Sequence, residues 1–297
     1  MLKATKGKFM EEKIETIINQ YRDRTLNRRD FFARLVAVTG SMAAAHLLLE
    51  SSGLAATLIS EVESEQTKVT STTVQFPSGN AVQGGGYLSV PQGAGSFPAV
   101  IVIHENRGLN EHTRDVARRF AAEGFVALAP DALSRKGGTA KMTSPDDARA
   151  AITSLTPEEA IADLKASLTY LDAQPKVKRG KLGSVGFCWG GARSFTLATE
   201  SDALRAAVVF YGTAPPPERI AQVRCPVLGL YGETDERITS RVPETAEAMK
   251  RAGKRFEYKI YPGVGHAFFN DTGERYQAEA AKDAWTRTLA FLRTNLG

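Results

Sequence analysis

The chain predicts an α/β fold in which a mainly parallel central sheet carries helices on both faces. Strand-like and helical segments alternate along most of the sequence, and glycine-rich or polar loops follow several strand-like runs. The strand-like runs occupy residues 70–76, 81–90, 97–104, 125–129, 181–187, 205–211, 225–231 and 256–261. Helical patterns, with apolar residues three and four positions apart, occupy residues 115–123, 157–172, 239–252 and 274–296. We expect the first two strands to form an antiparallel hairpin.

The N-terminal segment, residues 1–56, differs from the rest of the chain. The run Asn27-Arg28-Arg29-Asp30-Phe31-Phe32, followed by an apolar stretch over residues 35–49, resembles a twin-arginine export signal. That stretch is shorter than the ~20 residues that span a bilayer. The resemblance implies export to the periplasm by the twin-arginine machinery. The alternative is a cytoplasmic protein in which residues 10–24 form an amphipathic helical arm that packs on a partner.

Residues 57–297 are enough for one α/β domain with a single large core. The formal net charge of the 297-residue chain is +5, and part of that charge belongs to the N-terminal segment. The sequence has no basic patch interleaved with aromatic residues, so nothing in it indicates a nucleic-acid partner. The sequence leaves open whether the protein is a monomer or a homodimer.

The segment Gly186-Phe187-Cys188-Trp189-Gly190-Gly191 follows a strand-like run and precedes a helical one. Glycines allow a tight turn that exposes the central side chain, so Cys188 is a candidate nucleophile. At a helix N-terminus, unpaired N–H groups and the helix dipole favour thiolate, and the Trp189 N–H can stabilise an oxyanion. A lone cysteine among glycines is otherwise a small buried residue.

Two further residues complete this pattern. Asp235 follows one strand-like run and His266 follows the next, so nucleophile, acid and histidine come in the chain order of α/β-hydrolases. His266 would take the thiol proton, and Asp235 would fix the imidazole tautomer. Taken singly, His266 reads as a loop histidine and Asp235 as a turn or cap residue. Their order behind Cys188 favours a catalytic triad on an α/β-hydrolase fold.

From about residue 70 onward, these motifs resemble the dienelactone hydrolase family, whose members are cysteine-dependent α/β-hydrolases. The strand and loop Ala99-Val100-Ile101-Val102-Ile103-His104-Glu105-Asn106-Arg107-Gly108 adds a fourth match. The resemblance implies that Glu105 contacts the resting thiol and helps to activate it. It also implies that Asn106 supplies the second oxyanion-hole N–H. Without the resemblance, Glu105 reads as a helix-capping carboxylate.

One departure from the family pattern concerns the substrate. Four positions after the histidine, members that act on dienelactone carry an arginine that binds the substrate carboxylate, and this chain has Asn270. Dienelactone itself is therefore not the expected substrate. Arg107 and Arg193 are candidates to bind an anion near the cleft, although such arginines are more often solvated or paired at the surface.

Together these features predict an enzyme that cleaves small carboxylic esters or lactones through a cysteine thioester. We expect no cofactor, and no metal-ligand spacing is present. Cys225, which precedes Pro226, reads as structural. Two alternatives stay open: a thiol that handles peroxide or disulfides, and a ligand-binding protein that keeps the fold without catalysis.

Overall fold

The computed structural model describes residues 2–22, 25–26, 28–39, 69–78 and 82–297. The chain forms two compact units. The first comprises Met1–Gln66 with Asp271–Glu274, and the second comprises Thr67–Asn270 with Arg275–Gly297. The predicted boundary between residues 56 and 57 lies outside the described residues.

In the first unit, two helices pack against each other. They are α1 (Leu2–Arg22) and α2 (Arg28–Thr39). Their contact is a small apolar cluster in which the rings of Tyr21 and Phe31 stack with centroids 4.4 Å apart. Ile17 and Ile18, which belong to the predicted amphipathic helix at residues 10–24, are buried there. Within the described residues, no helix is both long and apolar enough to cross a membrane.

The second unit is built around an eight-stranded sheet with the order β1-β2-β4-β3-β5-β6-β7-β8. The strands are β1 (Val69–Ser78), β2 (Val82–Pro91), β3 (Phe97–Ile103), β4 (Val126–Pro130), β5 (Val177–Phe187), β6 (Leu204–Phe210), β7 (Val227–Gly232) and β8 (Phe256–Tyr261). The hairpin β1–β2 is antiparallel, as predicted, and β2 pairs antiparallel with β4. The remaining pairs are parallel, so the prediction of a mainly parallel sheet is confirmed.

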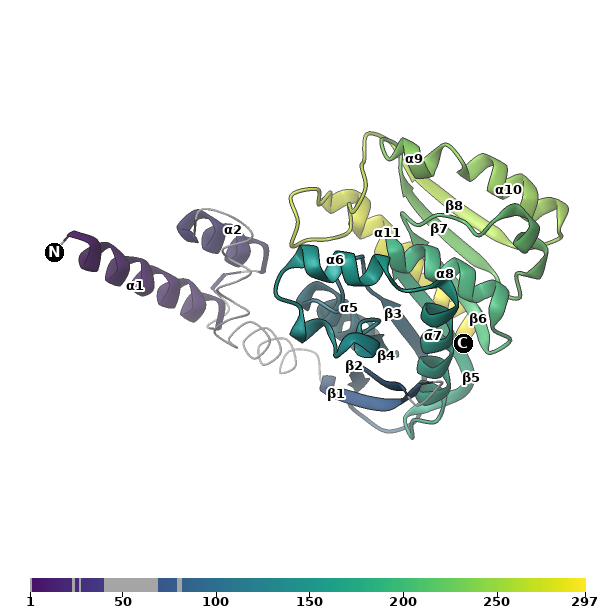
Figure 1. Cartoon of the computed structure of the whole chain (residues 1–297), viewed down its shortest axis with the longest axis horizontal. Helices are drawn as coiled ribbons and strands as arrows, with labels where there is room; N and C mark the ends of the chain where they lie inside the picture. The colour runs from purple at the N-terminus through teal and green to yellow at the C-terminus, as the bar shows by residue number, and fades with distance from the viewer. Residues whose placement is uncertain (1, 23–24, 27, 40–68, 79–81) are drawn as a thin grey trace. The chain divides into compact units, whose positions relative to one another are not determined.

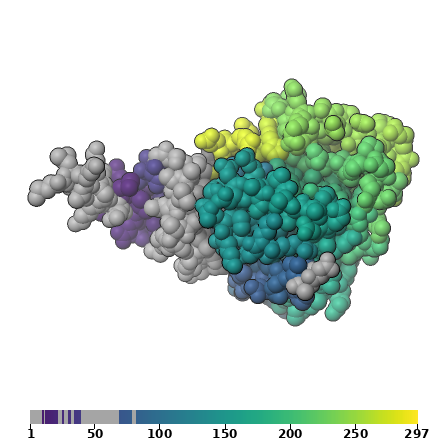
Figure 2. Space-filling model, in the orientation of Figure 1, coloured from purple at the N-terminus to yellow at the C-terminus, as the bar shows by residue number. Residues whose placement is uncertain are grey.

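Helices cover both faces of this sheet (Figure 1). They are α5 (Glu111–Ala122), α6 (Pro145–Thr153), α7 (Pro157–Asp172), α8 (Trp189–Glu200), α9 (Glu236–Thr239), α10 (Val242–Arg251) and α11 (Ala278–Leu296), with 3-10 turns η1 (Ser134–Lys136), η2 (Thr139–Lys141) and η3 (Pro217–Gln222). One apolar core joins the sheet to α5 and α11, and the other joins it to α7, α8 and α10. In the space-filling view, the teal segment with α6 and α7 covers the front of this unit (Figure 2).

The helices depart from the sequence prediction at two places. The helical pattern at residues 239–252 corresponds to α10, whose first turn holds Pro243, where a missing N–H costs nothing, but it does not predict the short helix α9 before it. The pattern does not predict α6, which buries only Ala148 and Ile152. Its cap is nevertheless regular, since the Ser144 hydroxyl accepts a hydrogen bond from the Asp147 N–H.

Candidate active site

A sharp turn after β5 holds Cys188 in a strained conformation. Its φ of 54° and ψ of −114° lie outside the regions that L residues usually adopt, and α8 begins at the next residue. The Cys188 N–H donates to the carbonyl oxygen of Phe210 at 3.0 Å, which fastens the turn to the end of β6. Strand, turn and helix therefore follow one another as in a nucleophile elbow.

Two glycines allow this turn because backbone passes directly over them. A Cβ on Gly186 would lie 1.9 Å from the carbonyl oxygen of Gly190. A Cβ on Gly190 would lie 2.3 Å from the carbonyl oxygen of Ile103 and 2.5 Å from that of His104. Gly190 thus lets the start of α8 rest against the loop that follows β3.

The structure brings His266 within hydrogen-bonding distance of both Cys188 and Asp235. His266 Nδ1 lies 2.5 Å from Asp235 Oδ2, and its Nε2 lies 3.1 Å from Cys188 Sγ. Because the carboxylate can only accept, Nδ1 carries the proton and Nε2 is left to accept from the thiol. The Asp235 and His266 side chains are only 9% and 19% exposed. The three residues form one chain of hydrogen bonds, and their catalytic roles stay predictions.

Glu105 follows β3 and is held by two neutral donors. The Tyr211 hydroxyl donates to Oε1 at 3.3 Å, and the Asn270 amide donates to Oε2 at 3.3 Å. Neutral donors fix the position of a carboxylate without cancelling its charge. Asn270, which stands where the family pattern has arginine, therefore contacts the glutamate that the resemblance singled out.

The resting thiol of Cys188 is protonated at neutral pH. Its pKa is raised from 9.0 to about 11, first by burial and next by the negative charge of Glu105. The Trp189 backbone N–H and the positive charge of Arg237 lower this pKa but do not outweigh the other effects. The helix N-terminus thus acts in the expected direction through the Trp189 N–H, but burial and Glu105 outweigh it in the resting state.

The two predicted oxyanion donors lie on the segments that meet at Gly190. Trp189 is the first residue of α8, and its backbone N–H lowers the pKa of the Cys188 thiol. Asn106 is half-buried in the turn after β3, next to Glu105. The Trp189 N–H therefore comes from the start of α8, and the Asn106 N–H from the turn that follows β3.

The two candidate arginines differ in their surroundings. Arg107 is exposed. The Arg193 guanidinium lies 5.3 Å from the centroid of the Trp189 ring, and burial lowers its pKa. Arg193 therefore packs on a side chain of the elbow, and binding of an anion by either arginine stays a prediction.

Sequence reasoning missed two residues at the site. Tyr211 is fully buried, donates to Glu105, and has its ring centroid 4.9 Å from that of His266. It ends an apolar strand-like run, so the sequence pattern predicts a core residue. The available signal was the place of this run beside the strand that leads into the Cys188 turn. Arg237 lies two positions after Asp235, and its charge acts on the thiol of Cys188.

Backbone strain is concentrated at this site. In the described part of the chain, the non-glycine residues with positive φ are Cys188 at 54°, Tyr211 at 39° and Ala267 at 63°. Cys188 belongs to the hydrogen-bond chain, Ala267 follows His266, and the Tyr211 ring lies beside that of His266. Such conformations persist only where surrounding structure enforces them, which is typical of functional sites.

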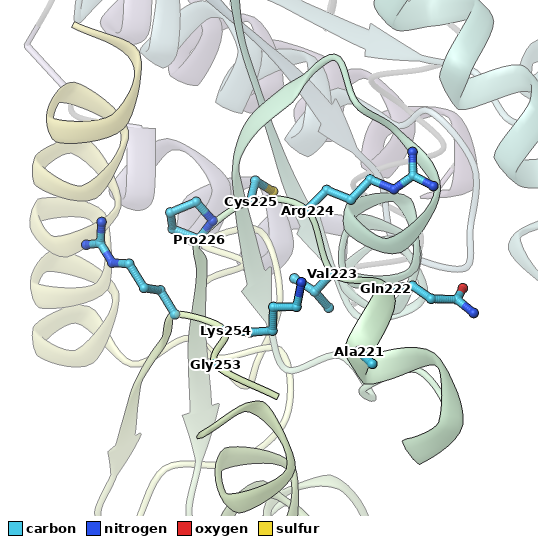
Figure 3. A pocket seen from close by; sticks show the side chains of 9 residues that line it. Ala221, Gln222, Val223, Arg224, Cys225, Pro226, Gly253 and Lys254 are labelled. Carbon is cyan, nitrogen blue, oxygen red and sulfur yellow. The ribbon is translucent and has the colours of Figure 1, made fainter. Parts of the chain in front are cut away.

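The second cysteine lies away from these residues. Cys225 stands before β7, at the opposite end of the strand from Asp235, in a hollow of about 480 Å³ lined by residues 221–226 and 253–255 (Figure 3). Burial raises its pKa to about 12, so the thiol is protonated and behaves as a small apolar group. Over the part of the chain that the structure describes, no group of three or more His, Cys, Asp or Glu residues could hold a metal ion.

Comparison with known proteins gives consistent matches. The sequence profile of the Dienelactone hydrolase family matches residues 85–296. A Methylorubrum extorquens protein named "Putative carboxymethylenebutenolidase" is 34% identical over 219 residues, which cover 70% of this chain and 75% of that protein. A Bradyrhizobium protein named "Probable 2-oxo-3-(5-oxofuran-2-ylidene)propanoate lactonase" is 33% identical over 222 residues, or 71% and 89% of the two chains. The crystal structure of a "Putative Dienelactone Hydrolase" from Klebsiella pneumoniae superimposes with a TM-score of 0.70 at 31% identity, covering 76% of this chain and 98% of that one.

Proposed function

The chain belongs to the dienelactone hydrolase family of ester and lactone hydrolases, and on that basis we propose that it acts through a thioester on Cys188. The hydrogen-bond chain from Asp235 through His266 to Cys188 Sγ carries this proposal. It supplies a nucleophile, a base and a group that orients the base, which is the set that nucleophilic acyl transfer requires.

In the first half-reaction, His266 Nε2 takes the thiol proton as Sγ bonds to the substrate carbonyl carbon. The carbonyl oxygen becomes an oxyanion, to which the backbone N–H groups of Trp189 and Asn106 donate. The imidazolium, stabilised by Asp235, then gives its proton to the leaving alkoxide as the C–O bond breaks. The product is a thioester on Cys188.

The second half-reaction repeats this path with water. His266 removes a proton from water, the hydroxide attacks the thioester carbonyl, and the same N–H groups receive the second oxyanion. Collapse of that intermediate breaks the C–S bond and releases the carboxylic acid. The proton on His266 returns to Sγ, which restores the protonated thiol of the resting site.

Glu105 regulates the thiol in this scheme. Its charge helps to keep Cys188 protonated when no substrate is bound, since a nearby negative charge raises the pKa of a thiol. Tyr211 and Asn270 hold the carboxylate in that position. The active thiolate therefore forms only when His266 removes the proton during attack on substrate.

For the substrate, we propose small esters or lactones. The substrate needs no carboxylate for the residue at position 270 to bind. The Asn270 amide already donates to Glu105, and a neutral amide attracts an anion less than a guanidinium does. Lactones are included because relatives at 33–34% identity carry lactone-hydrolase names.

The decisive experiment incubates the reduced protein with p-nitrophenyl esters and small lactones, alongside Cys188→Ala, His266→Ala and the matched control Cys225→Ala. Turnover lost in the first two variants but kept in the control, with an acyl adduct on Cys188 by intact mass, is the expected result. Hydrolysis that survives in Cys188→Ala would exclude the thioester. Peroxide consumption without ester turnover would favour the redox alternative, and binding without turnover would favour the ligand-binding one.

We further propose that the N-terminal segment directs export by the twin-arginine machinery. The paired Arg28 and Arg29 and the apolar run at residues 35–49 support this proposal. The test replaces both arginines by lysine, which keeps the charge, and measures the protein in periplasmic and cytoplasmic fractions. Equal distribution of the native and the double-lysine chain would contradict export by this route.

A further inference from the structure

A buried histidine links the two segments that border the thiol. His104 is fully buried directly after β3, and its ring stacks on the Trp189 indole with centroids 5.6 Å apart and planes inclined by 13°. The Arg193 guanidinium lies over the same indole. His104 therefore contacts the residue after the nucleophile and also begins the loop that carries Asn106.

The hydrogen bonds of His104 allow only one arrangement of its protons. The Ala132 N–H donates to Nε2 at 3.2 Å, so this nitrogen must be an acceptor. Nδ1 lies 2.6 Å from the carbonyl oxygen of Glu105, which can only accept, so Nδ1 must carry the proton. The imidazole is therefore neutral, and burial, which lowers its pKa, keeps it so.

This arrangement fixes the orientation of one peptide group. The Glu105 carbonyl and the Asn106 N–H belong to the same peptide, and the described chain contains no cis peptide bonds. In a planar trans peptide, the C=O and N–H bonds point in opposite directions. Since the carbonyl points at the imidazole, the Asn106 N–H points away from it.

We propose that His104 is a positioning residue for the oxyanion hole. Its Nδ1–H holds the Glu105–Asn106 peptide so that the Asn106 N–H faces the reacting carbonyl, and its ring supports Trp189, which carries the other donor. Gly190, which rests against the backbone carbonyls of Ile103 and His104, keeps the two segments in contact. This inference rests on the proposed function, because an oxyanion forms only in acyl transfer.

The test compares variants that separate the hydrogen bonds of His104 from its ring. His104→Phe keeps a flat ring on Trp189 and removes both bonds, whereas His104→Gln can donate and accept at similar positions without the ring. His112→Phe is the matched control, since it removes another buried imidazole, one that packs on Phe187 and Phe269. Circular dichroism and thermal unfolding establish that each variant is folded.

Two rates are measured for every protein. Turnover of p-nitrophenyl acetate needs both the thiol and the oxyanion hole, whereas alkylation of Cys188 by iodoacetamide needs the thiol alone. We expect His104→Phe to lower kcat by about tenfold to a hundredfold with little change in KM, because an oxyanion donor acts in the transition state. Its alkylation rate should match that of the native chain, and His104→Gln should recover most of kcat.

Several outcomes would overturn the inference. One is a folded His104→Phe with native kcat; another is an equal loss of kcat and alkylation, which would indicate general loosening. His104→Gln decides if His104→Phe does not fold. A folded His104→Gln with a tenfold lower kcat and the native alkylation rate would exclude the hydrogen bonds of His104 as the cause of the positioning. A native chain without Cys188-dependent hydrolysis would instead overturn the proposed function itself, and this inference with it.

Discussion

Replacing Glu105 by glutamine tests whether its charge holds the Cys188 thiol in the protonated state. The substitution keeps the shape of the side chain and its bond from the Tyr211 hydroxyl. A flip of the Asn270 amide restores the second contact, because the new amide can then donate to the Asn270 oxygen. What changes is the negative charge that raises the pKa of Cys188.

The size of the effect follows from the pKa of about 11, compared with 9.0 for an unperturbed thiol. At pH 8 the thiolate fraction is then about a hundredfold smaller than for a free cysteine, since each pKa unit is a factor of ten. Burial is the larger cause and remains in the variant. Glu105→Gln should therefore recover only part of this factor, and the pKa should lie between 9.0 and about 11.

The assay is the rate of iodoacetamide alkylation of Cys188 between pH 6 and 11, followed by intact mass. The rate should rise with pH to a midpoint near 11 in the native chain and to a lower midpoint in Glu105→Gln. Glu123→Gln, which removes a carboxylate that pairs with Arg293, is the charge-matched control and should follow the native curve. Equal midpoints in native chain and Glu105→Gln, or a native midpoint below pH 8, would refute the reasoning.

Three further predictions concern single positions. Asn270→Arg should raise kcat/KM for a lactone that bears a carboxylate roughly tenfold relative to a neutral ester, through a charge-assisted hydrogen bond; an unchanged ratio in paired assays would contradict this. Gly190→Ala should cost about 2 kcal/mol or more in thermal unfolding and most of the activity, because its Cβ would lie 2.3 Å from the Ile103 carbonyl oxygen. The unfolded Cys225 thiol ionises near pH 9.0 and the folded one near 12, so native stability falls as pH rises through this window. Between pH 9 and 11, the free energy of unfolding in urea should fall less steeply for Cys225→Val than for the native chain, by about 1.4 kcal/mol per pH unit. Parallel curves would exclude Cys225 as the origin of the loss.

Much of the fold is predictable because its strands are short apolar runs bounded by glycine or polar loops. Each of the eight strand-like runs overlaps a strand of the sheet, and the differences are of a few residues at the ends. What failed was helix detail. The apolar pattern could not reveal α6, which buries two residues, or α9, a four-residue helix that buries only Ile238.

The site was predictable where chain order implies proximity. Cys188, Asp235 and His266 follow parallel strands, whose carboxyl ends meet at one edge of the sheet. The partners of Glu105 were not predictable in this way, since Tyr211 and Asn270 lie 106 and 165 positions along the chain from it. The direction of the Cys188 pKa depends on burial, which is a tertiary property and leaves no local signal.

The positive φ angle of Ala267 has a consequence for protein engineering. A side chain in this region costs of order 1 kcal/mol relative to glycine, so glycine at this position would make the folded chain more stable. The same change would leave the neighbouring His266 less precisely placed. A selection for heat resistance alone would therefore enrich substitutions at the residues that shape the site, and activity would fall as the melting temperature rose.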